Sequence, residues 1–313
     1  MEDKYIKYKT KYLELKNNNT LIQTGGGGGN KFKIIIDEPT VKYVKYNGKN
    51  TIHTTNTVDD EILNEKSEFM IGSITKLFTG MMIIILNDKK MLSVNDNINK
   101  YIEPNKNNKF ENVTINDVVN HKGGIIHYLT YSEIPGKYKI VNSSIEALKI
   151  FMKKPLCVGE IGVKKYSSIG FIILGAIIEK VTGLSYMEAL QKYILQPCKM
   201  FNTDIGEPNI TIYNNKISIG DSKIKEEKME KYMVNAGGGL YSCISDMVNF
   251  AKYIPKILTP LQIKRCYSYS ERNTIDHDGG IYGGRSFFKV EYTDKWKIKK
   301  IIIELETCTN YDY

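Results

Sequence analysis

The hydrophobic pattern along the chain is dominated by one stretch, Leu77–Leu86, in which apolar residues occupy every side of a helix. A helix that is apolar all round belongs in the interior of a domain rather than on its surface. A turn of small residues after Phe69 predicts where this helix begins. Ser73 and Lys76 lie at that point, one turn apart and therefore on the same face.

Strand patterns occupy the two ends of the chain. Near the N-terminus, the turn signal Asn47-Gly48 predicts a hairpin with a return strand at Thr51–Thr55. The strands expected before that turn are Lys33–Asp37 and Val41–Tyr46. Near the other end, a glycine-rich turn around Gly279–Gly284 precedes the closing strands Ser286–Tyr292 and Lys297–Glu304.

Helical patterns with start and stop signals fill the middle of the chain. Thr114 is placed to cap a short helix, and Gly183 is placed to end a longer one. Ser245 and Asp246 stand at the start of the last helical pattern, where we expect Ser245 to be the cap. The longer helices predicted in this way are Ser143–Lys153, Ile169–Val181, Ser185–Leu195 and Ser245–Ile254.

Strands at both ends and helices between them predict an α/β (α+β) fold, in which helices flank an antiparallel sheet and a helical insertion interrupts it. The folded domain should span 31–313, with sheet parts at about 31–95 and 231–313 and the helical insertion at about 96–230. We expect the functional site between the sheet and the insertion.

Residues 1–30 form a separate segment ahead of this domain. Tyr5, Tyr8, Tyr12 and Leu15 have the spacing of a short amphipathic helix, and a glycine-rich linker follows. The helix at residues 5–15 is a candidate docking element for a protein partner.

Composition narrows the classes of function. The chain has 313 residues, of which 42% are hydrophobic and 25% charged, as in ordinary soluble globular proteins. The net charge of +9 comes with a strong excess of lysine over arginine and with abundant Asn, Ile and Tyr, which indicates an AT-rich genome. The lysines form no dense basic run, so specific nucleic-acid binding is disfavoured.

Cysteine usage and hydropathy predict a reducing, intracellular setting. The five cysteines are scattered and include no C-x-x-C pair, which argues against a disulfide framework and a zinc site. We therefore predict neither a metal nor a cofactor. The charged N-terminus is unlike a signal peptide. The apolar runs at 81–86 and 169–178 are too short to span a membrane.

The pair Ser73 and Lys76 is the first candidate for chemistry. A hydroxyl beside an amine suggests a nucleophile and the group that activates it. The alternative is a serine cap followed by an ordinary helical lysine. Burying the charge of a lysine at the start of a wholly apolar helix costs free energy unless the amine has a partner. This cost favours the interpretation that Lys76 activates Ser73.

Four later segments bear on this pair. His121 lies in a glycine-terminated helix end, where a structural hydrogen bond is the expected role. Tyr166 could be a core aromatic, or its phenol could take a proton from Ser73 if a nearby ammonium lowered its pKa. The Ala236–Asp246 segment should be scaffold around the site. His277–Gly284 could be a plain turn, or it could supply a backbone N–H to an oxyanion hole.

In this order the segments resemble the serine β-lactamase and penicillin-binding protein superfamily. The closest branch is the class C-like one, with its D-alanyl-D-alanine carboxypeptidases, D-aminopeptidases and esterases. The resemblance covers about 41–305. The matching segments are Phe69–Lys76 for the G-S-x-T-K motif, His121–Ile125 for H-x-S-G-L, Tyr166–Ser168 for Tyr-x-Asn, Ala236–Ser242 for A-G-G-L-x-S and His277–Gly279 for Lys/His-x-Gly.

The resemblance implies a set of roles. Ser73 would be the acylated nucleophile, Lys76 would assist its deprotonation, and Tyr166 would relay protons. His277 stands where many relatives have lysine and would bind a substrate carboxylate or tune Tyr166. Substrate contacts would also come from Ser168, Gly279 and Gly280, the last through an N–H that stabilises the oxyanion together with that of Ser73.

Departures from the family pattern leave a second hypothesis open. Ser168 replaces the family's Asn and cannot offer an amide's paired donor and acceptor. The family's last strand and C-terminal helix find no counterpart after Glu304, so one sheet face should be bare unless the residue 5–15 helix or a partner covers it. The alternative function is therefore a catalytically impaired scaffold with a binding or structural role.

The leading hypothesis is a serine hydrolase that acts through an acyl-enzyme on a small-molecule or peptide amide or ester, of the β-lactamase, carboxypeptidase or esterase type. The N-terminal pattern also resembles the leaders of giant DNA virus proteins, which would place this protein in the host cytoplasm or the virion.

Overall fold

A computed structural model describes residues 30–37, 40–47, 57–58, 61–62, 66–127, 143–205, 235–266, 269–270, 273–281 and 284–307. The predicted return strand Thr51–Thr55 and the residue 5–15 helix lie outside these residues.

The main element is a six-stranded sheet in the order β10-β11-β12-β13-β1-β2. Every neighbouring pair in it is antiparallel, which confirms the predicted fold class. Both ends of the chain contribute, because β1 pairs with β13 and sets Ile34 opposite Ile303. The strands are β1 (Asn30–Asp37), β2 (Thr40–Asn47), β10 (Tyr269–Ser270), β11 (Thr274–Ile281), β12 (Gly284–Tyr292) and β13 (Ile298–Thr307).

The predicted glycine-rich turn at Gly279–Gly284 is wrong in its extent. Gly279 and Gly280 are strand residues of β11, paired with Ser286 and Arg285 of β12. The two strands are therefore longer than the alternation of apolar residues indicates, since glycine carries no side chain to mark a strand.

The two faces of this sheet differ in polarity. One face is buried and apolar, with Ile275, Phe288 and Ile303 each 0% exposed. The other carries Asp276, Asp278, and the ion pair Lys289–Glu291 at 2.9 Å. An antiparallel sheet can leave such a charged face to water. The residue 5–15 helix, which we named as a possible cover for this face, lies outside the described residues.

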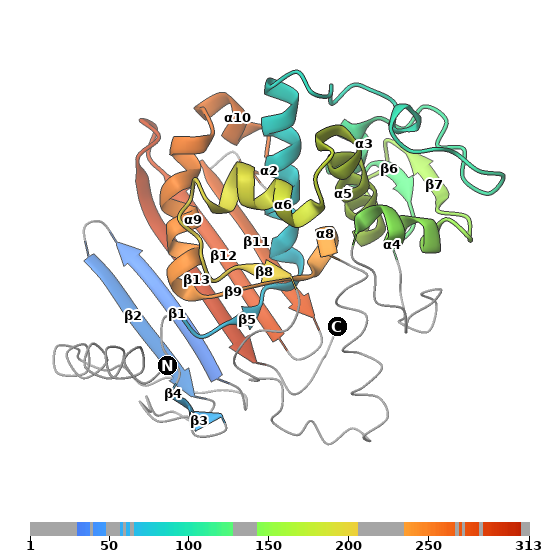
Figure 1. Cartoon of the computed structure of the whole chain (residues 1–313). Helices are drawn as coiled ribbons and strands as arrows, with labels where there is room; N and C mark the ends of the chain where they lie inside the picture. The colour runs from blue at the N-terminus through green and yellow to red at the C-terminus, as the bar shows by residue number, and fades with distance from the viewer. Residues whose placement is uncertain are drawn as a thin grey trace.

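Two helices cover the buried face, α2 (Thr75–Asp88) and α9 (Ile244–Ile257), as Figure 1 shows. The ring of Phe78 from α2 stacks on that of Phe250 from α9 at 4.2 Å, and Phe250 in turn contacts Phe288 of β12 at 5.4 Å. Every residue of α2 from Thr75 to Leu86 is buried, as the pattern predicted.

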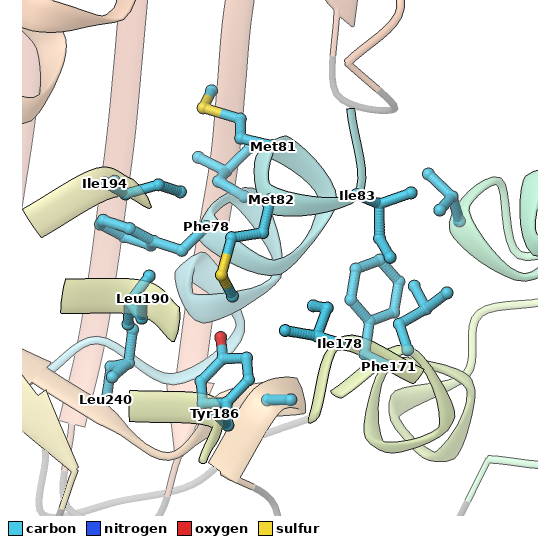
Figure 2. Packing of buried hydrophobic residues seen from close by; sticks show 14 of the residues in the cluster. Phe78, Met81, Met82, Ile83, Phe171, Ile178, Tyr186, Leu190, Ile194 and Leu240 are labelled. Carbon is cyan, nitrogen blue, oxygen red and sulfur yellow. The ribbon is translucent and has the colours of Figure 1, made fainter. Parts of the chain in front are cut away.

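Figure 2 shows how α2 fills the interior from more than one side. Ile83 points toward Phe171 and Ile178 of α5 (Ser168–Thr182), and Met82 points toward Tyr186. α2 is thus a central buried helix, and the neighbouring elements pack against it because its side chains are apolar in every direction.

The remaining predicted helices are present, and the structure adds three short ones that were not predicted, η2, α8 and α10. Thr114 forms a capping box at α3 (Ile115–Val119), Ser167 caps α5, and Gly183 ends α5 at φ 68°. The others are α4 (Ser144–Phe151), α6 (Tyr186–Leu190) with the π-turn η4 (Gln191–Leu195), α8 (Asn235–Gly238), α10 (Pro260–Lys264) and η2 (Ile98–Lys100). Ser245 is not a cap: α9 begins at Ile244 after Cys243, and it runs through Pro255.

Short strands tie the site segments together. β5 (Phe69–Met70) pairs with β9 (Leu240–Ser242), which also pairs with β8 (Asp204–Ile205). β6 (Gly123–Ile125) pairs with β7 (Cys157–Ile161) beside α3, α4 and α5 (Figure 1). β3 (Thr57–Val58) and β4 (Glu61–Ile62) form a pair of their own.

No single helix among the described residues is long and apolar enough to cross a membrane. The bent pair Ser168–Thr182 and Tyr186–Leu195 meets the length and hydropathy criteria only when its two parts are taken together.

The packing around α5 predicts that Gly175→Ala destabilises the protein. A Cβ at Gly175 would lie 2.3 Å from Ser144 Oγ and 2.5 Å from Ala236 Cβ, which is too close without rearrangement. Overpacking of this kind costs about 1–3 kcal/mol, which offsets the roughly 1 kcal/mol that alanine gains in a helix. Urea unfolding should show a lower free energy of unfolding for Gly175→Ala than for the wild type. The exposed Lys180→Ala in the same helix should change stability by less than about 0.5 kcal/mol.

Candidate active site

Ser73 lies in a single 3₁₀ turn, η1 (Gly72–Ile74), that leads directly into α2. Its backbone turns there because Gly72 adopts φ 48°, which glycine tolerates. Neither η1 nor α2 has a side-chain cap hydrogen bond, and the residues at the two N-cap positions are Ile71 and Ile74. The alternative that Ser73 serves as a helix cap is therefore wrong.

Lys76 is fully enclosed, with 0% of its surface exposed. Its Nζ donates hydrogen bonds to Ser73 Oγ at 2.9 Å and to the Gly237 carbonyl. It also lies 4.9 Å from the centre of the Tyr166 ring and 5.7 Å from that of Phe171. A lysine that seemed isolated in an apolar helix thus has partners from three other segments.

Burial sets the protonation of this amine. Loss of solvation lowers the pKa of Lys76 to about 7, although the negative charge of Asp278 raises it in part. Near neutral pH a large share of Lys76 is then uncharged. A neutral amine has a lone pair that can accept the proton of the Ser73 hydroxyl.

Tyr166 points its hydroxyl at the same serine. Its Oη donates to Ser73 Oγ over 2.7 Å, and 41% of the residue is exposed. The alternative that Tyr166 is an ordinary core aromatic is therefore wrong. Ser73 Oγ stands between a phenol and an amine, both within hydrogen-bonding distance.

Two histidines pack against the Tyr166 ring. The ring centres of His121 and His127 lie 4.6 Å and 5.4 Å from that of Tyr166. The N–H groups of Ser167 and Ser168 donate to the Nδ1 atoms of His121 (3.1 Å) and His127 (3.2 Å). These bonds tie both rings to the start of α5, immediately after Tyr166.

Both histidines are uncharged at neutral pH. Burial, followed by the charge of Lys76, lowers the pKa of His121 to about 3 and that of His127 to about 4. Because each Nδ1 accepts a backbone N–H, the ring proton sits on Nε2. His121 has the structural hydrogen bond that the sequence led us to expect. His127 was missed, since its position near the site comes from tertiary packing alone.

The edge of the sheet lies against the turn that carries Ser73. A Cβ on Gly279 would lie 2.2 Å from the Ile71 carbonyl, and one on Gly72 would lie 2.9 Å from the Gly280 backbone. Ser286 of β12 donates to the same Ile71 carbonyl at 2.8 Å. The glycines are needed here because two backbones touch. The backbones of Ser73 and Gly280 are thereby neighbours, as an oxyanion hole would require.

His277 does not supply a positive charge to the site. Burial and the charge of Lys76 lower the pKa of His277 to about 4, so the ring is neutral at pH 7. Its Nδ1 donates to the carbonyl of Asp278, which leaves Nε2 as an acceptor in the neutral ring. A neutral acceptor is a poor partner for a substrate carboxylate, which is one of the two roles that the resemblance implies.

Ser168 lies beside the Gly237 segment that receives the hydrogen bond from Lys76. It is 3% exposed and lies in the first turn of α5. Its carbonyl faces α8, where a Cβ on Gly237 would lie 2.9 Å away. It therefore supports the Gly237 segment, and its side chain is withdrawn from solvent.

A buried polar chain holds the Gly237 carbonyl in place. Thr79 of α2 donates to the carbonyl of Ala236 at 2.7 Å, and the Tyr186 hydroxyl lies 2.7 Å from Thr79 Oγ1. Figure 2 shows this hydroxyl directed toward α2. The sequence predicts that residues 236–246 are scaffold. It gives no sign that one of their backbone carbonyls accepts a hydrogen bond from Lys76.

The described residues contain no group of three or more His, Cys, Asp or Glu side chains placed to hold a metal ion.

Comparison with known proteins places this chain in a family. The model of the Beta-lactamase family matches residues 35–286, and the chain belongs to that family. A teichoic acid D-alanine hydrolase of Staphylococcus aureus is 25% identical over an alignment 252 residues long, which covers 74% of this chain and 60% of that protein. The chain thus spans about 60% of the length of the curated relatives that it matches.

Solved structures share the fold at low sequence identity. A D-amino acid amidase from Ochrobactrum anthropi SV3 superposes with a TM-score of 0.68 at 17% identity, over 89% of this chain and 88% of that one. A D-stereospecific amidohydrolase from Streptomyces sp. gives a TM-score of 0.66 at 17% identity, over 91% of each chain. The predicted architecture is confirmed by these neighbours.

The buried amine predicts a gain in stability for Lys76→Met. Because the pKa of Lys76 is lowered, the folded state binds fewer protons than the unfolded state between about pH 7 and pH 10.5. The cost of burying the amine is therefore full below pH 7 and shrinks as the pH rises toward 10.5. Lys76→Met should stabilise the protein by roughly 2–5 kcal/mol at pH 6 and by much less at pH 10.

Thermal melts at the two pH values would measure this difference. Lys180→Met, at an exposed position of α5, provides the matched control. A gain for Lys76→Met that is equal at pH 6 and pH 10 would show that the amine is not held with a lowered pKa.

Proposed function

We propose that this protein is a serine hydrolase that cleaves an ester or amide through an acyl-enzyme on Ser73. One observation carries the proposal: Ser73 Oγ lies within 2.9 Å of the buried Lys76 amine and within 2.7 Å of the Tyr166 hydroxyl. A nucleophile held between a base of lowered pKa and a second proton donor is the arrangement that acyl transfer needs.

The acylation step follows from the positions of these groups. Neutral Lys76 takes the proton of Ser73 as Oγ bonds to the substrate carbonyl carbon. The N–H groups of Ser73 and Gly280 would stabilise the oxyanion. The bond to the leaving group then breaks, Tyr166 donates its proton to the departing oxygen or nitrogen, and the proton held by Lys76 restores the phenol.

Deacylation uses the same groups in reverse. A water molecule attacks the acyl carbon and gives up a proton to the amine–phenol pair. Ser73 Oγ leaves the acyl carbon and recovers its proton. Atoms and charges balance over the cycle, and the product is a carboxylic acid.

The charge pattern supports esters and simple amides over β-lactams. β-Lactam drugs carry a carboxylate beside the reacting bond, and the neutral His277 offers it no cation. The relatives named above include a hydrolase of D-alanine on teichoic acid and an amidase of D-amino acids, and both names support ester or amide chemistry.

A catalytically impaired scaffold is the alternative, and Ser168 in place of the family's Asn is the observation in its favour. The hydrogen-bonded set of Ser73, Lys76 and Tyr166 argues against it, since a scaffold would not need to keep a costly buried amine beside a hydroxyl.

A fluorophosphonate probe tests the nucleophile. The intact protein should gain one probe mass on Ser73, and Ser73→Ala should gain none. Ser245→Ala, which removes a hydroxyl from the start of α9, should be labelled like the wild type. Absence of an adduct on the wild-type protein, measured by intact mass, would reject the proposal in favour of the scaffold.

The pKa of Lys76 predicts the pH dependence of hydrolysis. Below about pH 7 the amine becomes protonated and can no longer accept the proton of Ser73. With p-nitrophenyl acetate, kcat/KM should therefore fall about tenfold for each pH unit below 7 and level off above it. A rate that is flat between pH 5 and pH 8 would exclude Lys76 as the base.

A further inference from the structure

α2 has three buried polar side chains, and all three bond to one short stretch of backbone, residues 236–240. Thr75, Lys76 and Thr79 are each 0% exposed, and Thr75 and Thr79 share a face of the helix because they are four residues apart. The three hydrogen bonds run from the Leu240 N–H to Thr75 Oγ1 at 3.2 Å, from Lys76 Nζ to the Gly237 carbonyl and from Thr79 Oγ1 to the Ala236 carbonyl at 2.7 Å. The stretch thus lies along α2 in one defined register.

Three consecutive glycines, Gly237–Gly239, form the middle of this stretch. Glycine has no side chain that could hold the backbone in one register by packing, and its backbone adopts many conformations. The register therefore depends on the two ends of the stretch. The Leu240 end is held by strand pairing, since β9 pairs with β5 and the Leu240 carbonyl accepts the N–H of Ile71 at 3.0 Å.

The Ala236 end depends on the hydroxyl of Thr79. This hydroxyl has one proton and two carbonyls within reach, that of Ala236 at 2.7 Å and that of Thr75 at 3.3 Å. A threonine inside a helix commonly bonds to the carbonyl four residues earlier, which here is that of Thr75. The shorter bond to Ala236 is favoured by a group outside α2.

That group is Tyr186, whose Oη lies 2.7 Å from Thr79 Oγ1 (Figure 2). Because the Thr79 proton points to Ala236, the phenol is the donor in this contact, and its donation strengthens the bond from Thr79 to Ala236. Tyr186 is 1% exposed, and its backbone N–H donates to the Glu179 carboxylate of α5 at 3.1 Å. Its ring is therefore enclosed and its backbone is fixed.

We infer that Tyr186 and Thr79 are positioning residues that set the register of residues 236–240 along α2, so that the Gly237 carbonyl and no neighbouring one accepts the hydrogen bond of Lys76. Both side chains lie in the core and act on the reaction only through Lys76. The inference rests on the proposed function, in which Lys76 is the base.

Loss of the Tyr186 hydroxyl should change Lys76 through this register. Without the phenol, the Thr79 proton can turn to the Thr75 carbonyl, and the glycines allow residues 236–240 to shift. Lys76 then loses a well-placed acceptor. Because a carbonyl acceptor stabilises the protonated amine, its loss lowers the pKa of Lys76 below the wild-type value. The amine is also less well directed at the nucleophile.

Three variants test the register by the pH dependence of p-nitrophenyl acetate hydrolysis. Tyr186→Phe and Thr79→Val keep the shape of the side chain and remove the hydroxyl, and both should lower kcat about tenfold or more. The inflection of kcat/KM should move to a lower pH by about 0.5 unit. Thr79→Ser keeps the hydroxyl and should return both quantities toward the wild-type values. A loss in Thr79→Ser as large as that in Thr79→Val would assign the effect to packing and overturn the inference.

Two matched variants remove the same groups elsewhere. Tyr193→Phe deletes a phenol that contacts Met91 Sδ at 3.8 Å, and Thr182→Val deletes a hydroxyl that donates to the Ile178 carbonyl at 2.7 Å. Both should keep the wild-type kcat and inflection, because these bonds lie outside the glycine stretch. Tyr186→Phe with the same kcat and inflection as Tyr193→Phe would contradict the inference.

A direct titration of Lys76 separates this inference from the proposed function. The Cε resonance of isotope-labelled lysine is followed by NMR in Ser73→Ala, and the further change Lys76→Met identifies the signal. The titration midpoint should fall when Tyr186→Phe is added to Ser73→Ala. A lowered midpoint, together with no turnover by the wild type, would reject the hydrolase proposal alone. Turnover by the wild type, with a midpoint and rates that Tyr186→Phe leaves unchanged, would reject the positioning inference alone.

Discussion

The enclosure of the Lys76 amine is the constraint on which the rest of the site depends. Its Nζ has no exposed surface, and that burial brings the pKa of Lys76 down to about 7. Ser73 Oγ and the Gly237 carbonyl hold the amine in place. Taking this amine out of water costs free energy of folding. The apolar packing of α2, which is buried from Thr75 to Leu86, contributes to offsetting that cost. Desolvation of this amine lowers the stability of the folded protein at and below neutral pH.

Close backbone contact is the second requirement, and it joins segments far apart in the chain. Gly279 of β11 lies against the Ile71 carbonyl, and Gly72 lies against Gly280. A side chain at either glycine would push the sheet away from the turn that carries Ser73. Ser286 and the Thr79–Ala236 hydrogen bond fix the two flanking segments. The site therefore depends on these backbone contacts as well as on the side chains of Ser73, Lys76 and Tyr166.

Membership of the Beta-lactamase family identifies the fold, whereas the function depends on the groups that the fold brings together. The neutral His277 and the charged Asp278 occupy adjacent positions on opposite faces of β11. A single strand edge thereby combines an uncharged acceptor with a carboxylate.

The sequence by itself determined the central helix, most of the other helices, the antiparallel sheet class and the pairing of Ser73 with Lys76. These features depend on local periodicity, caps and a short motif, which a single chain displays directly. It misplaced the glycine turn, because glycines inside β11 look like loop residues. Only the tertiary structure decided that Tyr166 points at Ser73 and that Ser168 is withdrawn. It alone brought the Gly237 carbonyl to Lys76, because contacts between distant segments and the pKa shifts that follow from burial leave no local trace in the sequence.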